Sequence, residues 1–465
     1  MDAGVLAPAM FAGLVVFLLL GYPVAFALAA NGLLFAGIGI AGGLFDAALL
    51  HALPERVYGI VGNQTLLAIP FFAFMGLILE RSGMAEDLLD TIGQLFGALR
   101  GGLAYAVILV GGLLAATTGV VAATVIAMGL ISLPVMLRYG YDRRFAAGVI
   151  AASGTLAQIV PPSLVLIVLA DQLGASVGDM YKGALVPGLG LIALYLLYVF
   201  ALTLLHPAAV PAMPASARTL RGATMALRVL TTLLPPLVLI FLVLGTIFLG
   251  VATPTEGGAM GAAGALLLAW ARRRLSRSQL SQAMDGTARL TTFVIFILIG
   301  STVFTLVFRG LDGDVWVEHL FAQLPGGVLG FLAAVNLMVF ALAFFLDFFE
   351  IAFIAVPLLA PVAAKLGIDP IWFGVMLAVN MQTAFLHPPF GFALFYLKSV
   401  APKTVRTADI YRGAIPFLAI QLLMVAVVLA FPGVVLRDPP PEASSVTEIP
   451  LETDPDTGYL PAEWR

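Results

Sequence analysis

The chain has 465 residues, of which 61% are hydrophobic and 11% are charged, and its formal net charge is −3. A soluble domain of this length cannot bury so much apolar surface. The composition therefore excludes soluble catalytic and nucleic-acid-binding domains and predicts an all-α polytopic membrane protein. The absence of cysteine excludes disulfides and cysteine chemistry.

Residues 1–205 are predicted to form a first structural unit, which begins with scaffold helices in residues 1–79. Candidate spans follow one another at 5–20, 22–45 and 66–79. The N-terminus carries Asp2 and no basic segment, which favours a retained first span over a cleaved signal peptide.

Three further elements complete the first unit. Charged residues alternate with leucines in 80–99, which predicts an amphipathic arm along the membrane interface. Residues 101–137 are apolar but are interrupted at Ala116–Gly119 into arms shorter than the about 20 residues that a crossing needs, so we expect a re-entrant helical hairpin. A broken helix at 145–170 and a full span at 185–205 follow.

Residues 206–229 are rich in proline and arginine and are expected to form a cytoplasmic linker, after which the order of elements repeats over 230–436. The second unit contains spans at 230–250, 257–271 and 290–308, an amphipathic stretch at 310–325, a hairpin at 327–366 broken at Leu346–Glu350, a broken helix at 371–397 and a last span at 413–436. The tail, 437–465, is rich in proline and acidic residues and is expected to be disordered.

Short motifs recur in the two halves in the same order, which predicts an internal duplication. The paired motifs are Ile131–Pro134 with Ile354–Pro357, Gly140–Asp142 with Gly367–Asp369, and Asp179–Ala184 with Asp409–Ala414. Counting spans places most Lys and Arg residues on the cytoplasmic side, including those of 138–144, 206–229 and 398–412. The same count puts the two hairpins on opposite sides of the membrane, so the repeats are inverted, as in secondary transporters.

Each predicted broken helix contains a pair of prolines, Pro161-Pro162 in the first and Pro388-Pro389 in the second. Proline has no backbone N–H to donate, so nearby carbonyls and the hydroxyls of Thr155 and Thr383 lose helical partners. Hydrocarbon does not tolerate such groups unless protein buries them or they line a wet cavity. One break reads as an ordinary proline kink, but two at matching places predict a binding site.

The predicted hairpin tips carry the candidate ion ligands. Asp347 and Glu350 are ionisable groups within an apolar segment, where they serve a functional site, are merely solvated, or cap the second arm of the hairpin. The other tip has Thr117, Thr118 and Gly119, whose hydroxyls and freed carbonyls suit Na⁺. The alternative for these threonines is helix packing.

The substrate is expected to be an anion, because half-helix N-termini aimed at one cleft favour negative charge. His387 precedes Pro388 and is placed to donate to a substrate carboxylate or to bond a freed carbonyl. The candidate substrate-binding residues are Ser153, Pro161, Ser163, Glu350, His387 and Gly391.

Several motifs together resemble the large membrane subunit of tripartite ATP-independent periplasmic (TRAP) transporters, over nearly the whole chain to about residue 436. These motifs are Gly21–Phe26, Leu67–Gly76, Ser153–Thr155 with Pro161–Ser163, Ala252–Glu256 and Phe345–Asp347. The resemblance implies an elevator-type importer of a small organic anion in the bacterial inner membrane, driven by Na⁺ as coupling ion and with no other cofactor. It also implies two partners, a periplasmic substrate-binding protein and a small membrane subunit.

Carried over residue by residue, the resemblance implies two Na⁺ sites. One comprises Thr117, Thr118, Gly119 and Thr155, and the other comprises Asp347, Thr383 and Pro388. The chain departs from the family pattern in having less serine at the first tip and Phe-Leu-His before the second proline pair.

Three other readings compete with this one. A stand-alone Na⁺/dicarboxylate symporter has the same broad architecture and needs no binding protein. An intramembrane hydrolase also places carboxylates within the membrane, but the sequence has no H-E-x-x-H and no G-x-S-x-G motif. A channel does not need two matching broken helices. We therefore expect a transporter and not an enzyme.

Overall fold

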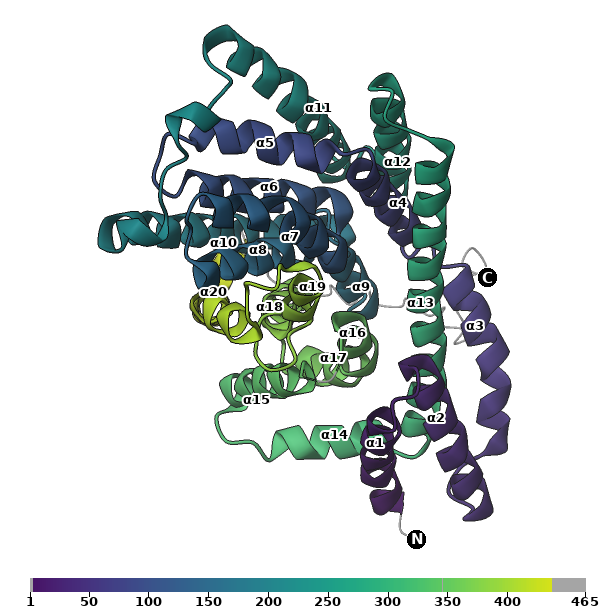
Figure 1. The fold of residues 1–465 in the computed structure, drawn as a ribbon. Helices are drawn as coiled ribbons and strands as arrows, with labels where there is room; N and C mark the ends of the chain where they lie inside the picture. Colours follow the sequence, from purple (N-terminus) through teal and green to yellow (C-terminus); the bar gives the residue numbers. More distant parts are fainter. Residues whose placement is uncertain (1–2, 345, 437–465) are drawn as a thin grey trace, which may run out of the picture.

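The computed structural model describes residues 3–344 and 346–436, apart from the side chains of residues 3, 4, 117, 118 and 322. The described part of the chain consists of α-helices and short 3-10 turns and contains no β-strand (Figure 1). The predicted all-α class is confirmed. The predicted disordered tail, 437–465, lies outside the described residues.

The described part of the first half contains ten α-helices. They are α1 (Ala3–Leu19), α2 (Val24–Ala41), α3 (Leu53–Val61), α4 (Ala68–Arg81), α5 (Met84–Phe96), α6 (Gly102–Thr118), α7 (Val121–Arg138), α8 (Arg143–Thr155), α9 (Leu164–Gln172) and α10 (Val177–Leu205).

The second half repeats much of this order. Its helices are α11 (Gly222–Phe248), α12 (Pro254–Ala271), α13 (Arg277–Gly310), α14 (Gly313–Ala322), α15 (Gly327–Leu342), α16 (Phe348–Ile354), α17 (Val356–Lys365), α18 (Pro370–Ala384), α19 (Phe392–Val400) and α20 (Thr407–Ala430).

Six of the described helices are long and apolar enough to cross a membrane, and the number rises to eight if each strongly bent pair counts as one span. The six are α2, α7, α10, α11, α13 and α20. One bent pair is α4 with α5, whose axes differ by 61°, and the other is α16 with α17, which differ by 52°. The chain is therefore a multi-pass membrane protein by length and composition of its helices.

The structure differs from the sequence prediction at several places, and α10 and α13 begin earlier than the predicted spans at 185–205 and 290–308. A 3-10 turn and α3 occupy residues 47–61, where no element was expected. Helix α11 begins at Gly222, inside the range 206–229 that was predicted as linker. The second arm of the second hairpin is bent between α16 and α17, next to Pro357, because proline removes a helical hydrogen bond there.

Helices of one half pack against helices of the other. Helix α2 lies along α13, and α4 lies along α12, and these are two of the most extensive helix contacts in the described chain. Gly300 allows the first of these contacts, because a Cβ there would lie 2.2 Å from the carbonyl oxygen of Ala25. Small residues at such crossings let helix backbones approach closely in a membrane.

The hairpins, broken helices, α10 and α20 gather into one cluster, with α2, α4, α12 and α13 along its side (Figure 1). Helix α5 lies at one edge of this cluster and α14 at the opposite edge (Figure 1). Most apolar side chains of α5 are buried and Glu86 and Asp90 are exposed, so the helix is amphipathic as predicted. Its position along a membrane interface stays a prediction.

Candidate functional site

Two broken helices form the frame of the candidate site. Helix α8 ends at Thr155, a 3-10 turn covers 156–158, and the chain resumes as α9 at Leu164. Helix α18 ends at Ala384, and the chain resumes as α19 at Phe392. Both breaks fall within the ranges predicted as broken helices, and the Pro161–Pro162 and Pro388–Pro389 bonds are both cis.

Matching aspartates start the two broken helices. The side chain of Asp142 accepts hydrogen bonds from the backbone N–H groups of Arg144 and Phe145, at 2.9 and 3.0 Å. The side chain of Asp369 accepts from the backbone N–H of Trp372 at 2.9 Å. Because an aspartate at this position satisfies helix-terminal N–H groups, the recurring Gly-x-Asp motif fixes where each broken helix begins.

Serines on the first broken helix bond to their own segment. Ser163 caps α9, because its hydroxyl accepts from the backbone N–H of Leu166 at 3.5 Å and donates to the carbonyl oxygen of Gln158 at 2.6 Å. Ser153 donates to the carbonyl oxygen of Val149 at 2.6 Å and faces Gly111 of α6. Both hydroxyls therefore stabilise the backbone around the break in this conformation.

The tip of the first hairpin lies against the second part of the first broken helix. Gly119, between α6 and α7, has φ of +59°, in the left-handed region that glycine adopts most easily. A Cβ at this position would lie 3.0 Å from Cγ of Leu164, the first residue of α9. The side chains of Thr117 and Thr118 lie outside the described residues, so their predicted role as Na⁺ ligands stays a prediction.

At the second hairpin, Asp347 and Glu350 cap α16. The Asp347 side chain accepts from the backbone N–H of Glu350, and the Glu350 side chain accepts from the backbone N–H of Asp347, both at 2.8 Å. This reciprocal arrangement is a capping box. Capping, one of the three roles that the sequence left open for these carboxylates, is thus present in the structure. In the described hydrogen bonds only one carboxylate oxygen of Asp347 accepts a bond.

A buried polar network joins the two broken helices. The side-chain amide of Gln382 on α18 donates to the Thr155 hydroxyl at 3.2 Å, and the amide of Gln421 on α20 donates to the same oxygen at 3.1 Å. Gln421 also donates to the hydroxyl of Tyr195 on α10 at 2.9 Å. All four side chains are fully buried. The network therefore connects α8, α10, α18 and α20.

The hydroxyl of Thr155 is fully used in this network. It donates to the carbonyl oxygen of Ala152 at 2.8 Å and accepts from both glutamine amides. A hydroxyl has one proton and two lone pairs, so these three bonds leave no lone pair for a cation in this conformation. Coordination of Na⁺ by this oxygen requires at least one glutamine to move away.

A second network links α18 to the first arm of the second hairpin. The amide of Asn380 donates to the side-chain and backbone oxygens of Asn336 on α15, both at 2.8 Å. Thr383 donates to the carbonyl oxygen of Asn380 at 2.7 Å. Because its proton is directed to that carbonyl, the lone pairs of the Thr383 hydroxyl stay available to a ligand.

The ring of His387 packs against two phenylalanine rings. One belongs to α15 and the other to the segment that follows α15. Its ring centroid is 4.9 Å from that of Phe340 and 4.0 Å from that of Phe344. The side chain is buried, and neither ring nitrogen has a hydrogen-bond partner among the described residues. The alternative in which His387 bonds a freed carbonyl is therefore not seen, and both nitrogens are left for a ligand.

The structure brings some candidate residues together and keeps others apart. Thr155 and Thr383 are connected through Gln382, and Asp347 and Glu350 bond each other. The backbone N–H of His387 donates to the carbonyl oxygen of Thr383 at 3.1 Å, but no described side-chain hydrogen bond joins His387 to either pair. Pro388 and Gly391 lie in the loop before α19, where Tyr411 of α20 donates to the carbonyl oxygen of Pro389 at 3.0 Å.

Sequence reasoning missed the polar residues that form the two networks. They are Gln382, Gln421, Tyr195, Asn336 and Asn380. The signal was present, because an amide within an apolar span is a polar group that hydrocarbon does not satisfy. What the sequence did not show is that three amides, from α18 and α20, converge on Thr155 and Asn336.

Comparisons with known proteins agree with this architecture. The family model described as the DctM component of tripartite ATP-independent periplasmic transporters matches residues 11–434. The C4-dicarboxylate TRAP transporter large permease DctM of Pseudomonas aeruginosa is 33% identical over 401 residues, which cover 85% of this chain and 91% of that protein. The sialic acid TRAP transporter large permease SiaM of Vibrio cholerae is 28% identical, and the alignment covers 88% of this chain and 96% of SiaM.

Among solved structures, the YdaH transporter of Alcanivorax borkumensis matches with a TM-score of 0.59 at 17% identity, over 90% of this chain and 97% of that one. This likeness concerns the fold alone. The curated relatives are named as transporter permeases, so the chain is a multi-pass protein of the bacterial inner membrane and not an enzyme. The extent of the family match and the identity to the Pseudomonas permease show that the chain belongs to the family of large membrane subunits of TRAP transporters.

Proposed function

We propose that this secondary transporter subunit imports a small carboxylate together with Na⁺. The observation that carries the proposal is the hydrogen bond between Gln382 and Thr155, which joins the ends of two broken helices 227 residues apart in sequence. Two unwound segments that meet in a buried polar centre provide free carbonyls for cations and helix N-termini for anions. This combination fits coupled transport of Na⁺ and an organic anion.

The proposed Na⁺ sites lie where each hairpin meets a broken helix. Thr117, Thr118 and Gly119 approach the start of α9 and form one site, which Thr155 joins when its amide partners move away. Asp347, Thr383 and Pro388 form the other, with the free lone pairs of Thr383 and one oxygen of Asp347 as ligands. Oxygen ligands of these kinds suit a hard cation.

A carboxylate is the proposed substrate class. Curated relatives are named for C4-dicarboxylates and sialic acid, and another is named for ectoine. In this chain Ser163 and Gly391 stand at the N-termini of the second halves of the broken helices, where the helix dipole favours an anion. The unpartnered ring nitrogens of His387 offer a hydrogen-bond donor near Gly391.

We further propose an elevator movement of the cluster formed by the hairpins, broken helices, α10 and α20. Helices α2, α4, α12 and α13 pack mainly with one another and serve as the static scaffold. The same order of elements in the two halves, inverted across the membrane, provides alternating access. The family implies delivery of substrate by a periplasmic binding protein and assembly with a small membrane subunit.

Replacement of external Na⁺ by choline is expected to abolish concentrative uptake in proteoliposomes that contain this chain, its small membrane subunit and its binding protein. The reason is that both proposed sites contain only oxygen ligands and at most one carboxylate, which bind Na⁺ but not a bulky organic cation. The measurement is uptake of radiolabelled substrate under a Na⁺ gradient. Equal uptake in choline contradicts the sodium coupling, and a control with valinomycin and K⁺ tests the effect of membrane potential.

Omission of the binding protein is expected to reduce uptake to background. The candidate substrate residues include no Lys or Arg, so a carboxylate is held by helix dipoles and neutral donors, each contributing about 0.3–1 kcal/mol. Such a site binds free substrate weakly and depends on delivery. The measurement is uptake at saturating Na⁺ with and without the binding protein. Robust uptake of free substrate contradicts the proposal and identifies a stand-alone Na⁺/dicarboxylate symporter.

A further inference from the structure

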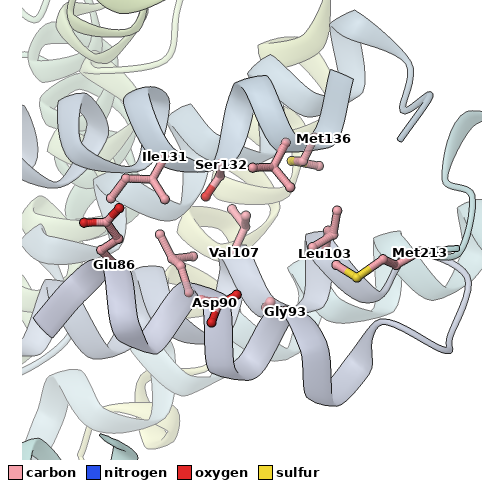
Figure 2. A pocket seen from close by; sticks show the side chains of 12 residues that line it. Glu86, Asp90, Gly93, Leu103, Val107, Ile131, Ser132, Met136 and Met213 are labelled. Carbon is pink, nitrogen blue, oxygen red and sulfur yellow. The ribbon is translucent and has the colours of Figure 1, made fainter. Parts of the chain in front are cut away.

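An apolar cavity of about 290 Å³ lies away from the candidate transport site, under helix α5 (Figure 2). Helix α5 forms one wall, and α6 and α7, the arms of the first hairpin, form the others. Met213 of the segment between α10 and α11 closes one end. The lining residues from α5 are Glu86, Leu89, Asp90 and Gly93, and those from the hairpin are Leu103, Ala106, Val107, Ile131, Ser132, Val135 and Met136.

The polarity of the lining changes along the cavity. In Figure 2 the carboxylate of Glu86 stands at one end beside Ile131, the hydroxyl of Ser132 faces the middle of the space, and Leu103 and Met213 stand at the other end. Glu86 and Asp90 are exposed, so the charged end reaches the surface of the protein. A carboxylate, a hydroxyl and an apolar wall follow one another along the cavity. This order matches the charged head group, polar linking group and apolar tail of an amphiphile.

Ser132 is buried without a hydrogen bond. The residue as a whole is 7% exposed, and its hydroxyl, which faces the cavity, makes no hydrogen bond with any described residue. A serine in a helix usually returns its proton to a carbonyl one turn earlier, as Ser153 does with Val149. A hydroxyl that faces the cavity and has no protein partner can donate its proton to a ligand that carries a hydrogen-bond acceptor.

Glu86 is also the unpaired acid of its helix. Asp87 pairs with Arg274 at 2.9 Å, and Asp90 pairs with Arg228 at 3.5 Å. No Lys or Arg among the described residues pairs with Glu86. The cavity therefore presents one uncompensated negative charge at its mouth, which selects a positively charged head group.

We propose that this cavity binds an ethanolamine phospholipid, with one acyl chain between α5 and the hairpin, the ammonium group at Glu86 and an ester carbonyl accepting from Ser132. The chain is a multi-pass membrane protein, so lipid is the amphiphile at highest concentration around it. An acyl chain gains little on passing from lipid to an apolar cavity, so selectivity comes from the two polar contacts. A primary ammonium satisfies both the charge and the hydrogen-bonding capacity of Glu86.

The lipid fastens the first hairpin to helix α5. Helix α5 is also tied by Asp87 and Asp90 to Arg228 of α11 and by Asp87 to Arg274, which precedes α13. A molecule between α5 and the hairpin therefore holds the hairpin against the group of helices that contains α11 and α13. Its release is required before the hairpin moves relative to that group.

The second half offers a natural contrast. A smaller cavity, of about 120 Å³, lies between α14, α1 and the second hairpin, in the position that corresponds to the first cavity. Its lining is apolar throughout, with Trp316, Met338 and Leu342 among its residues. With neither carboxylate nor hydroxyl, it does not select a head group, so the proposed lipid site belongs to the first half alone.

The test uses the purified, delipidated full chain and native mass spectrometry with lipids that share the same acyl chains. Phosphatidylethanolamine is expected to bind about fivefold tighter than phosphatidylglycerol, because the ammonium pairs with Glu86 and the glycerol head does not. Glu86→Gln is expected to bring this ratio close to one. Ser132→Ala is expected to weaken both lipids about threefold to tenfold, because both carry the ester carbonyl.

Two further variants locate the site. Ala106→Phe fills the cavity and is expected to abolish binding of both lipids, whereas Glu55→Gln, an exposed carboxylate on α3, is expected to change nothing. Thermal unfolding of each variant shows whether it is folded, and if Ala106→Phe is not, Glu86→Gln and Ser132→Ala decide the outcome. Equal binding of the two lipids to the wild type, or an unchanged ratio in Glu86→Gln, overturns the proposal.

Discussion

Gly413→Ala is expected to destabilise the folded chain by about 3 kcal/mol or more, the largest effect of a single methyl group that the structure indicates. A Cβ at Gly413 of α20 would lie 1.9 Å from the carbonyl oxygen of Arg144 on α8. A Cβ at Gly148 would meet the carbonyl oxygen of Gly413 at 2.0 Å. Both neighbours are backbone atoms, so the two helices have to separate to admit the methyl group.

The measurement is the thermal unfolding midpoint of the purified chain in detergent, together with uptake after reconstitution. Gly245→Ala in α11 is the matched control, because nothing lies within 4 Å of a Cβ at that helical position. It is expected to leave the midpoint unchanged or to raise it, since alanine is favoured over glycine in a helix by about 0.5–1 kcal/mol. A Gly413→Ala midpoint equal to that of the control contradicts close contact between α8 and α20.

Asp347→Asn is expected to raise the Na⁺ concentration needed for half-maximal uptake about tenfold while leaving stability near that of the wild type. Asparagine caps a helix as well as aspartate does, so the bond from the backbone N–H of Glu350 is kept and only the charge is lost. Asp347→Ala removes both and is expected to lower stability by about 1 kcal/mol in addition. The pair of variants therefore separates capping from cation binding.

Asp369→Asn is the control for this series. Asp369 caps α18 through the backbone N–H of Trp372, in the same manner as Asp347 caps α16, but it stands at the far end of the broken helix. Its replacement is expected to leave the Na⁺ dependence of uptake unchanged. Wild-type Na⁺ dependence in Asp347→Asn shows that this carboxylate serves the helix terminus alone and removes it from the proposed ion site.

The helix breaks were predictable from the sequence because their causes are local. The unwound segments fall at the proline pairs 161–162 and 388–389 and at the glycine at 119, close to the expected positions, whereas the pair Pro235-Pro236 lies inside the continuous helix α11. The amphipathic face of α5 was equally visible, since it depends on residues three or four apart.

The polar networks were not predictable, because their partners are distant in sequence. The bonds from Gln382 and Gln421 to Thr155 cross 227 and 266 residues, and no local pattern pairs these amides with that hydroxyl. The bend between α16 and α17 was not predicted. Pro357 lies in the first turn of α17, and a proline at that position does not by itself show that a bend precedes the helix. Whether Asp347 caps, binds a cation, or does both depends on geometry that composition does not show.

Matching glycines in the motifs of the predicted repeat both contact the opposite half of the chain. Gly413 packs on α8 of the first half, and Gly183, its counterpart in the first half, lies against Ile371 and Val375 of α18 in the second. Each half thus supplies the small residue that the broken helix of the other half needs. The same motifs also make contacts within their own halves, because Tyr181 donates to the carbonyl oxygen of Ser163 at 3.4 Å and Tyr411 donates to that of Pro389 at 3.0 Å.

The contact between α8 and α20 also sets an order for biogenesis. Gln421 is synthesised 266 residues after Thr155, so at about 5–20 residues per second the ribosome finishes the partner of α8 roughly 13–50 s after α8 itself. During that interval the face with Gly148 and Thr155 lacks its packing partner α20. Pausing of translation between α10 and α20 prolongs this exposure, because the helix that packs on this face, α20, belongs to the second half.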